Sequence, residues 1–229
     1  MPGSYRLSEM SEFAETMAAV VSEIHPLLKA VGFRKRRHTF NRSSEPGVTQ
    51  VINFQMAQRL PPGAEPIPPV RLDLYGMFTV NFGIAIREAW DLSRHGGQQF
   101  PAFVNDYDCE IRERLGQIIG KQGDTWWPLS EDAHALAQEV GTAIFDHGIE
   151  WLDRRGTRSS ILELYDAGGL RALPLPTALP IVMILRHRGA MEQAAVMLRA
   201  YYEPVTHPGH RERVFEIAEL LGITGLSPP

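Results

Sequence analysis

Three carboxylates alternate along the short stretch DYDCE, at Asp106, Asp108 and Glu110. On an extended backbone alternate side chains point the same way, so all three would face one side. Oxygen-rich sets of this kind can hold Mg²⁺ or Ca²⁺, which makes these residues weak candidates for a metal site. The stretch lacks the glycine and the final glutamate of a calcium-binding loop. Arg112 and Arg114 continue the same parity, so a carboxylate–guanidinium ladder across strands explains the pattern without a metal.

A basic stretch, GFRKRRHTFNR at residues 32–42, is the second place where charge could carry function. On a strand, Arg34 and Arg36 face one side while Lys35 and Arg37 face the other. A nucleic-acid groove would need its charges on one face with aromatic side chains between them. We therefore interpret the stretch as a solvated edge strand, whose charges discourage unwanted strand pairing. The functional alternatives are a patch for an acidic partner and a weak nucleic-acid site over residues 34–42.

The tryptophan pair Trp126-Trp127 is a candidate anchor for a partner protein. On a strand one ring faces the core and the other faces outward, and tryptophan is enriched in binding hot spots. Uncharged polar residues on two predicted strands could extend such a site, although a solvent-facing sheet surface has the same pattern; they are Asn53, Gln55, Thr79 and Asn81. The candidate binding residues are therefore Arg34, Arg36, Asn53, Gln55, Asn81, Arg112, Arg114, Trp126 and Trp127.

No recognisable catalytic set accompanies these residues. Cys109, the one cysteine, has no histidine near it in the sequence, so we expect a small buried hydrophobe rather than a nucleophile. The HPGH stretch at residues 207–210, with Glu212, is interpreted as a turn before the last helix rather than a metal site. Phosphate-binding glycine loops, dinucleotide fingerprints and hydrolase elbows are missing. We therefore predict neither a cofactor nor a catalytic residue.

The amino-acid composition is that of an ordinary globular protein. Of 229 residues, 44% are hydrophobic and 22% charged. The net charge of −4 means that no global field favours nucleic acid or an anionic membrane. A single cysteine suits a reducing compartment. We expect a cytoplasmic protein, because the sequence shows neither a signal peptide nor an apolar run long enough to span a membrane.

Hydrophobic periodicity predicts the elements that position these residues. A helix is expected over residues 11–31, capped by Ser11 and ended by Gly32. Period-two alternation and turn signals predict strands at residues 32–42, 48–56 and 71–86, a turn at 43–47 and a stiff proline-rich loop at 60–70. Residues 91–110 look irregular around Gly96-Gly97, and residues 111–116 fit either a strand or a helix.

The remainder of the chain reads as helical. Ser130 is the expected N-cap of a helix that ends near Gly156. Further helices are predicted at residues 157–167, 177–188, 190–203 and 210–222, with breaks at Gly168-Gly169, Pro174/Pro176 and Gly189. This segregation predicts an α+β fold: an N-terminal helix, a mostly antiparallel β-sheet, then an all-helical C-terminal region. We place the sheet domain at residues 1–167 and the helical extension at 168–229.

Several blocks in the sheet half resemble one known bacterial family. GFRKRRHTFNR, VINFQ, FTVNFGI, CEIRERLG and TWW, in this order, resemble the domain-of-unknown-function family numbered 4304, over roughly residues 12–165. The resemblance implies an α+β domain and favours a strand for residues 111–116. It implies no activity, cofactor or catalytic residue. Family members often have histidine where this chain has Glu110, which argues against a catalytic role for that position.

Taken together, the residues predict a non-enzymatic module that binds another protein, with an accessory or toxin-neutralising role as the specific guess. Nucleic acid and membrane are not expected partners. The alternative is a metal-dependent enzyme acting on a phosphorylated substrate through Asp106, Asp108, Glu110, Arg112 and Arg114.

Overall fold

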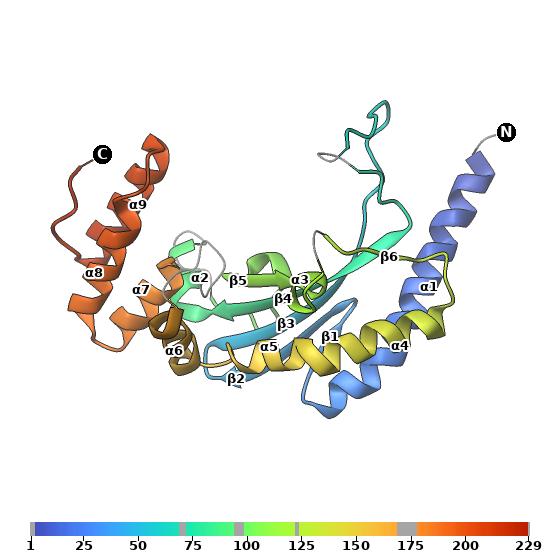
Figure 1. The fold of residues 1–229 in the computed structure, drawn as a ribbon, viewed down its shortest axis with the longest axis horizontal. Coiled ribbons are helices and arrows are strands. Elements are labelled where there is room, and N and C mark those ends of the chain that lie inside the picture. Colours follow the sequence, from blue (N-terminus) through green and yellow to red (C-terminus); the bar gives the residue numbers. More distant parts are fainter. Residues whose placement is uncertain (1–2, 69–71, 94–98, 122–123, 169–177, 229) are drawn as a thin grey trace.

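The computed structural model describes residues 3–68, 72–93, 99–121, 124–168 and 178–228. An antiparallel sheet forms the middle of an elongated molecule, and the two termini lie at opposite ends (Figure 1). Helix α1 (Gly3–Ala30) and the row α4 (Ala133–Ala143), η2 (Ile144–Gly148) and α5 (Ile149–Asp153) lie along one side of the sheet. The C-terminal helices extend from one end. The predicted α+β fold class, with an N-terminal helix, an antiparallel sheet and C-terminal helices, is confirmed.

The sheet is built from successive antiparallel neighbours. Its order is β1-β2-β3-β4-β5, and β6 pairs with β4. The strands are β1 (Arg34–Arg36), β2 (Thr39–Glu45), β3 (Val48–Met56), β4 (Met77–Ile86), β5 (Ile111–Arg114) and β6 (Trp127–Pro128). The turn between β2 and β3 falls at Pro46-Gly47, within the predicted turn. The basic stretch therefore includes an edge strand, because β1 ends the row, and its three residues are all exposed.

The two faces of the sheet differ in chemistry. Most even-numbered apolar residues of β2 to β4 are buried, and Phe40, Ile52 and Phe82 are fully so. They pack with residues of the helix layer such as Ile24 and Val140 in one continuous core. Burying side chains of this size is worth about 1.5–3 kcal/mol each, so this face drives the docking of α1 and α4. The opposite face carries most of the polar candidates.

The remaining helical elements include α6 to α9, which lie close to the ranges predicted for the C-terminal region. They are α2 (Arg87–Ser93), the 3₁₀ turn η1 (Asp106–Asp108), α3 (Leu115–Ile118), α6 (Arg158–Gly168), α7 (Ala178–His187), α8 (Met191–Tyr202) and α9 (Pro208–Leu221). The breaks expected at Gly96-Gly97, Gly169 and Pro174/Pro176 lie outside the described residues. The core continues from the sheet into α7, α8 and α9. The division into domains at residue 167 stays a prediction.

The strand expected at residues 32–42 is wrong, because a hairpin divides it. β1 and β2 pair around a two-residue turn, Arg37-His38. Arg37 has a φ of 54°, which two-residue hairpin turns require. The Arg-His pair lacks the Asn-Gly or Asp-Gly signal that marks such turns in a sequence. Arg37 therefore lies in a turn and not on a strand face.

Three other boundaries differ from the prediction. β4 begins at Met77, because the chain turns at Gly76, whose φ is 81°. Helix α1 starts at Gly3 instead of Ser11. Asp132 caps α4 in place of Ser130, since its side chain accepts a 2.9 Å hydrogen bond from the Ala135 amide. Residues 111–116 combine both possibilities, a strand to Arg114 and a helix from Leu115.

Candidate functional site

A row of polar side chains crosses all five main strands on the face away from α1 and α4. The register pairs Arg36 with Thr39, Thr39 with Asn53, Asn53 with Asn81, and Asn81 with Arg114. Paired residues of antiparallel strands share one face. The row thus has uncharged groups in the centre and a guanidinium at each end. We call this surface the polar face; it comprises Arg34, Arg36, Thr39, Asn41, Asn53, Gln55, Thr79, Asn81, Arg112, Arg114 and Trp126.

Hydrogen bonds among the central side chains hold their orientation. Asn53 Nδ2 donates to Thr39 Oγ1 at 2.9 Å. Asn81 Nδ2 donates to Gln55 Oε1 at 2.8 Å and, more weakly, to Asn53 Oδ1 at 3.4 Å. Asn81 is buried, Asn53 half-buried and Gln55 exposed. The centre of the polar face is therefore a preorganised set of amides, with Gln55 open to solvent.

The two arginine edges differ in their charge balance. On the β5 edge, Arg112 Nη2 lies 3.0 Å from Asp106 Oδ2, and Arg114 forms an ion pair with Asp124. On the β1 edge, Arg34 and Arg36 are exposed. Neither makes an ion pair within the described part of the chain. Positive charge on the polar face is therefore available chiefly at the β1 edge.

Aromatic rings lie beside both edges. The Arg114 guanidinium carbon is 5.2 Å from the centroid of Trp126. Trp126 is half-buried, and its Nε1 donates to Asp124 at 2.9 Å. At the other edge, the Arg36 guanidinium lies 6.0 Å from the Phe103 ring. The polar face therefore offers flat apolar surface next to charge, as protein-binding surfaces do.

Trp127 takes the opposite side, as the alternation predicted. Trp127 lies in β6, where it pairs with Phe78 of β4, and it is 4% exposed. Its Nε1 donates to Glu139 of α4 at 2.9 Å, which satisfies the buried donor. Trp127 is therefore the inward ring of the pair, a core residue that does not belong to the polar face, while Trp126 lies just before β6 and is half-buried.

A connecting segment covers the part of this face next to the polar row. Asn41 Nδ2 donates to the Val104 carbonyl at 2.9 Å, and the Val104 amide donates to Asn41 Oδ1 at 2.6 Å. Val104 packs with Val51, Ala85 and Cys109 in a second small core. Thr39, Asn41 and Phe103 were not among the residues predicted for this surface. Recognition of the Arg37-His38 turn would have placed Thr39 and Asn41 on the face of Arg34 and Arg36.

The carboxylates of the DYDCE stretch make hydrogen bonds within the fold. Residues 106–108 form a 3₁₀ turn, so the expected extended arrangement of Asp106, Asp108 and Glu110 is wrong. Glu110 Oε2 accepts from the Ile86 amide at 2.8 Å, and Asp108 accepts from Asn105 at 3.1 Å. Within the described ranges, histidine, cysteine and carboxylate side chains form no group of three that could hold a metal ion.

Cys109 behaves as the sequence predicted. Its side chain is buried against Gly83, where an added Cβ would lie 2.5 Å from Sγ. Burial, followed by the charges of Glu110 and Asp106, holds the pKa of the Cys109 thiol well above its ordinary value. A thiol in this environment is a poor nucleophile.

The side chain of Arg42, the last residue of the basic stretch, lies on the helix side of the sheet. Its Nε donates to Gln50 Oε1 at 2.6 Å and its Nη1 to the Val31 carbonyl at 3.2 Å, and it forms an ion pair with Asp153. Lys35 pairs with Phe40 and so points to the same side. The basic stretch therefore contributes only Arg34 and Arg36 to the polar face.

The segment that carries β4, β5, β6 and α4 has a counterpart among known families. The family model described as Domain of unknown function (DUF4304) matches residues 72–154. This segment resembles DUF4304. The expected family is thus supported over part of the range predicted for it. The DUF4304 segment supplies Thr79, Asn81, Arg112, Arg114 and Trp126 to the polar face, whereas Arg34, Arg36 and Asn53 lie outside it.

No curated protein and no solved structure matches the chain. Across the described residues, the helices are too short or too polar to cross a membrane. The family description names no activity.

Proposed function

We propose that the polar face binds an extended, acidic segment of another protein. The observation that carries this proposal is the row from Arg36 to Arg114, with amides between two guanidinium groups. Asparagine and glutamine side chains both donate and accept, so they can pair with the amides and carbonyls of a peptide backbone. Arg34 and Arg36 are suited to carboxylates of the segment.

The dimensions suit a peptide that crosses the strands. Neighbouring strands are about 4.8 Å apart, so the row from β1 to β5 spans roughly 19 Å. An extended peptide rises about 3.3 Å per residue, so about six residues reach from one edge to the other. Trp126 would receive an apolar side chain at the β5 end, where Arg114 already stacks on its ring.

The charge distribution supports a protein partner over nucleic acid. A nucleic-acid surface needs several cations along the path of the phosphates. On the polar face, Arg112 and Arg114 already have acidic partners, which leaves positive charge at one edge. The overall charge of −4 opposes a polyanion as well. A short acidic segment with one or two carboxylates matches this arrangement better.

Fluorescence anisotropy with labelled peptides would test the proposal. The probe is an extended peptide in which glutamate alternates with threonine and a leucine lies at one end. We expect saturable binding to the full chain and at least about a tenfold loss in the Arg34→Ala/Arg36→Ala double variant. Gln55→Ala should weaken binding, and it should also cost about 1 kcal/mol of stability, because it removes the acceptor of the Asn81 Nδ2 hydrogen bond.

A control pair removes the same charge elsewhere. Arg154 and Arg213 are exposed arginines of α5's C-terminal end and α9, outside the polar face. Arg154→Ala/Arg213→Ala should bind the peptide as the unaltered chain does. Equal loss in both double variants would show that only net charge matters and would contradict the proposal. Tighter binding of a thymidine oligonucleotide, sensitive to Arg34→Ala/Arg36→Ala, would reassign the face to nucleic acid.

The proposed setting is the bacterial cytoplasm. The lone, buried Cys109 supports a reducing compartment, because a chain with one cysteine cannot form an internal disulfide. Fractionation of cells that express the chain would test the location; recovery from a secreted or membrane fraction would contradict it.

A further inference from the structure

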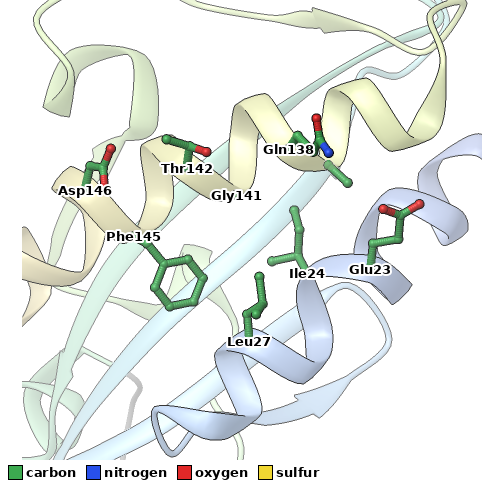
Figure 2. A pocket seen from close by; sticks show the side chains of 9 residues that line it. Glu23, Ile24, Leu27, Gln138, Gly141, Thr142, Phe145 and Asp146 are labelled. Carbon is green, nitrogen blue, oxygen red and sulfur yellow. The ribbon is translucent and has the colours of Figure 1, made fainter.

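A groove opens between α1 and the row α4–η2, on the opposite side of the sheet from the polar face. Its volume is about 480 Å³. Figure 2 shows the side chains that line it, with Leu27 and Phe145 turned toward the space between the helices. The lining residues are Glu23, Ile24, Leu27, Ala137, Gln138, Gly141, Thr142, Phe145 and Asp146. Leu27 is 53% exposed and Phe145 is only partly buried, so the groove presents apolar surface to solvent.

Local backbone geometry shapes this groove. Gly141 lies where α4 faces α1; a Cβ there would be 3.7 Å from Ile24 Cγ1, an ordinary van der Waals contact. Phe145 and Asp146 belong to η2, which is a π-helical turn. Such turns are frequent at functional sites. Gly148, in the same turn, packs so closely on the Phe82 ring that a Cβ would lie 2.5 Å away. The π-helical turn therefore contacts the sheet through Gly148, and its Phe145 side chain points toward Leu27 (Figure 2).

The rim of the groove is acidic. Glu23 and Asp146 are its charged residues, and lysine and arginine do not contribute to the lining. Glu23 Oε2 lies 2.8 Å from His134 Nδ1, so its charge has a neighbouring partner. Asp146 is exposed and forms no ion pair with the described residues. The open negative charge therefore lies at the Phe145 end.

We propose that this groove binds an amphipathic helix of a partner protein that carries lysine or arginine beside its apolar face. One apolar side chain of that helix fits between Leu27 and Phe145, and a cation next to it pairs with Asp146. Helix-in-groove binding uses apolar anchors at helical spacing in this way. The acidic rim selects a basic segment, whereas the polar face selects an acidic one, so the two surfaces take different occupants.

A designed peptide tests this proposal on the full chain. The probe is a labelled helical peptide with leucines along one face and lysines elsewhere, titrated by fluorescence anisotropy. We expect saturable binding that weakens at least about tenfold in Leu27→Asp. Asp146→Lys should also weaken binding and lower its salt dependence, because one charge pair is lost. Both positions are exposed, so circular dichroism melts should match those of the unaltered chain.

Matched controls carry the same changes on surfaces away from the groove. Leu220 on α9 is 68% exposed, and Glu163 on α6 is exposed. Leu220→Asp and Glu163→Lys should leave binding unchanged, and so should Arg34→Ala/Arg36→Ala on the polar face. The proposal is overturned by an absence of saturable binding, by equal losses in the controls, or by equal binding of a glutamate-for-lysine peptide. Self-association that Leu27→Asp abolishes would overturn it too, since the occupant would then be a second copy of this chain.

Discussion

Arg158 and Glu88 form two parallel hydrogen bonds, Nε to Oε1 at 2.6 Å and Nη2 to Oε2 at 2.9 Å. Arg158 also donates from Nη1 to Glu45 Oε1 at 2.8 Å and to the Pro46 carbonyl at 3.0 Å. Both side chains of the Arg158–Glu88 pair are mostly buried. This guanidinium therefore joins α6, α2 and the turn between β2 and β3, which ties the start of the helical region to the sheet.

Removing this guanidinium should destabilise the protein strongly. Arg158→Ala removes the guanidinium from two carboxylates, and the buried Glu88 then keeps only His187 Nε2, 3.7 Å away, as an ion-pair partner among the described residues. We expect the free energy of unfolding to fall by about 3 kcal/mol in chemical denaturation. Arg154→Ala is the control: its pair with Glu150 is exposed, so the change should stay within about 0.5 kcal/mol. Similar costs for the two variants would contradict the structural role of Arg158.

The same pair predicts a pH dependence of stability. Burial alone would raise the pKa of Glu88, but hydrogen bonds from Arg158 and from its own backbone, with the Arg158 charge, lower it overall. A depressed folded pKa contributes stability above the unfolded value, about 4.3, that is lost as pH falls through the folded pKa. The stability difference between the unaltered chain and Glu88→Gln should be largest near neutral pH and shrink below about pH 4. A constant difference across that range would refute the assignment.

Asn41 should control the segment that covers part of the polar face. Asn41→Ala removes both hydrogen bonds to Val104, each worth about 1 kcal/mol. We expect a loss of about 2 kcal/mol in stability and faster hydrogen exchange at the Val104 amide. Ser43→Ala, an exposed position on the same strand and face, should change neither quantity. An unchanged exchange rate in Asn41→Ala would show that other contacts hold the segment.

Two helical glycines should respond in opposite ways to alanine. At Gly148 a Cβ would lie 2.5 Å from the Phe82 ring, so Gly148→Ala should cost about 2 kcal/mol through overpacking. At Gly141 the nearest atom would be 3.7 Å away, an ordinary contact. Gly141→Ala should therefore be neutral or stabilising by up to about 1 kcal/mol, since alanine favours helix. Thermal melts of the two variants measure these effects, and an equal change in melting temperature for both would contradict the close packing of Gly148 on Phe82.

Cys109 should be unreactive in the folded protein. Its raised pKa and burial predict slow labelling by a thiol reagent at neutral pH and fast labelling in denaturant. A raised folded pKa also makes stability fall as pH rises above the unfolded value, about 8.5, because only the unfolded thiol ionises there. This alkaline loss should be smaller in Cys109→Ala. Rapid labelling of the native chain would show that the segment over Cys109 opens readily.

Much of the architecture follows from local sequence. Alternation in residues 48–56 and 71–86 predicted the two central strands, observed as β3 and β4, because one face of each must be apolar to cover the core. Gly32, with a φ of 92°, ends α1 as expected, since few other residues accept that conformation. The helices after residue 157 also lie close to their predicted ranges, because glycine and proline positions marked their ends in the sequence. The hairpin turn at Arg37-His38 was missed, because it depends on the pairing of β1 with β2.

The grouping of the candidate residues needed the tertiary structure. Sequence alone grouped Asn53 and Asn81 on one polar face but did not place Arg36 or Arg114 relative to it, because side-chain parity is a local property of a strand. Strand register, set by hairpins and core packing across the whole sheet, brings them into one row. It also sends Arg42 to the helix side. The groove between Leu27 and Phe145 had no sequence signal, since two helices far apart in the chain create it.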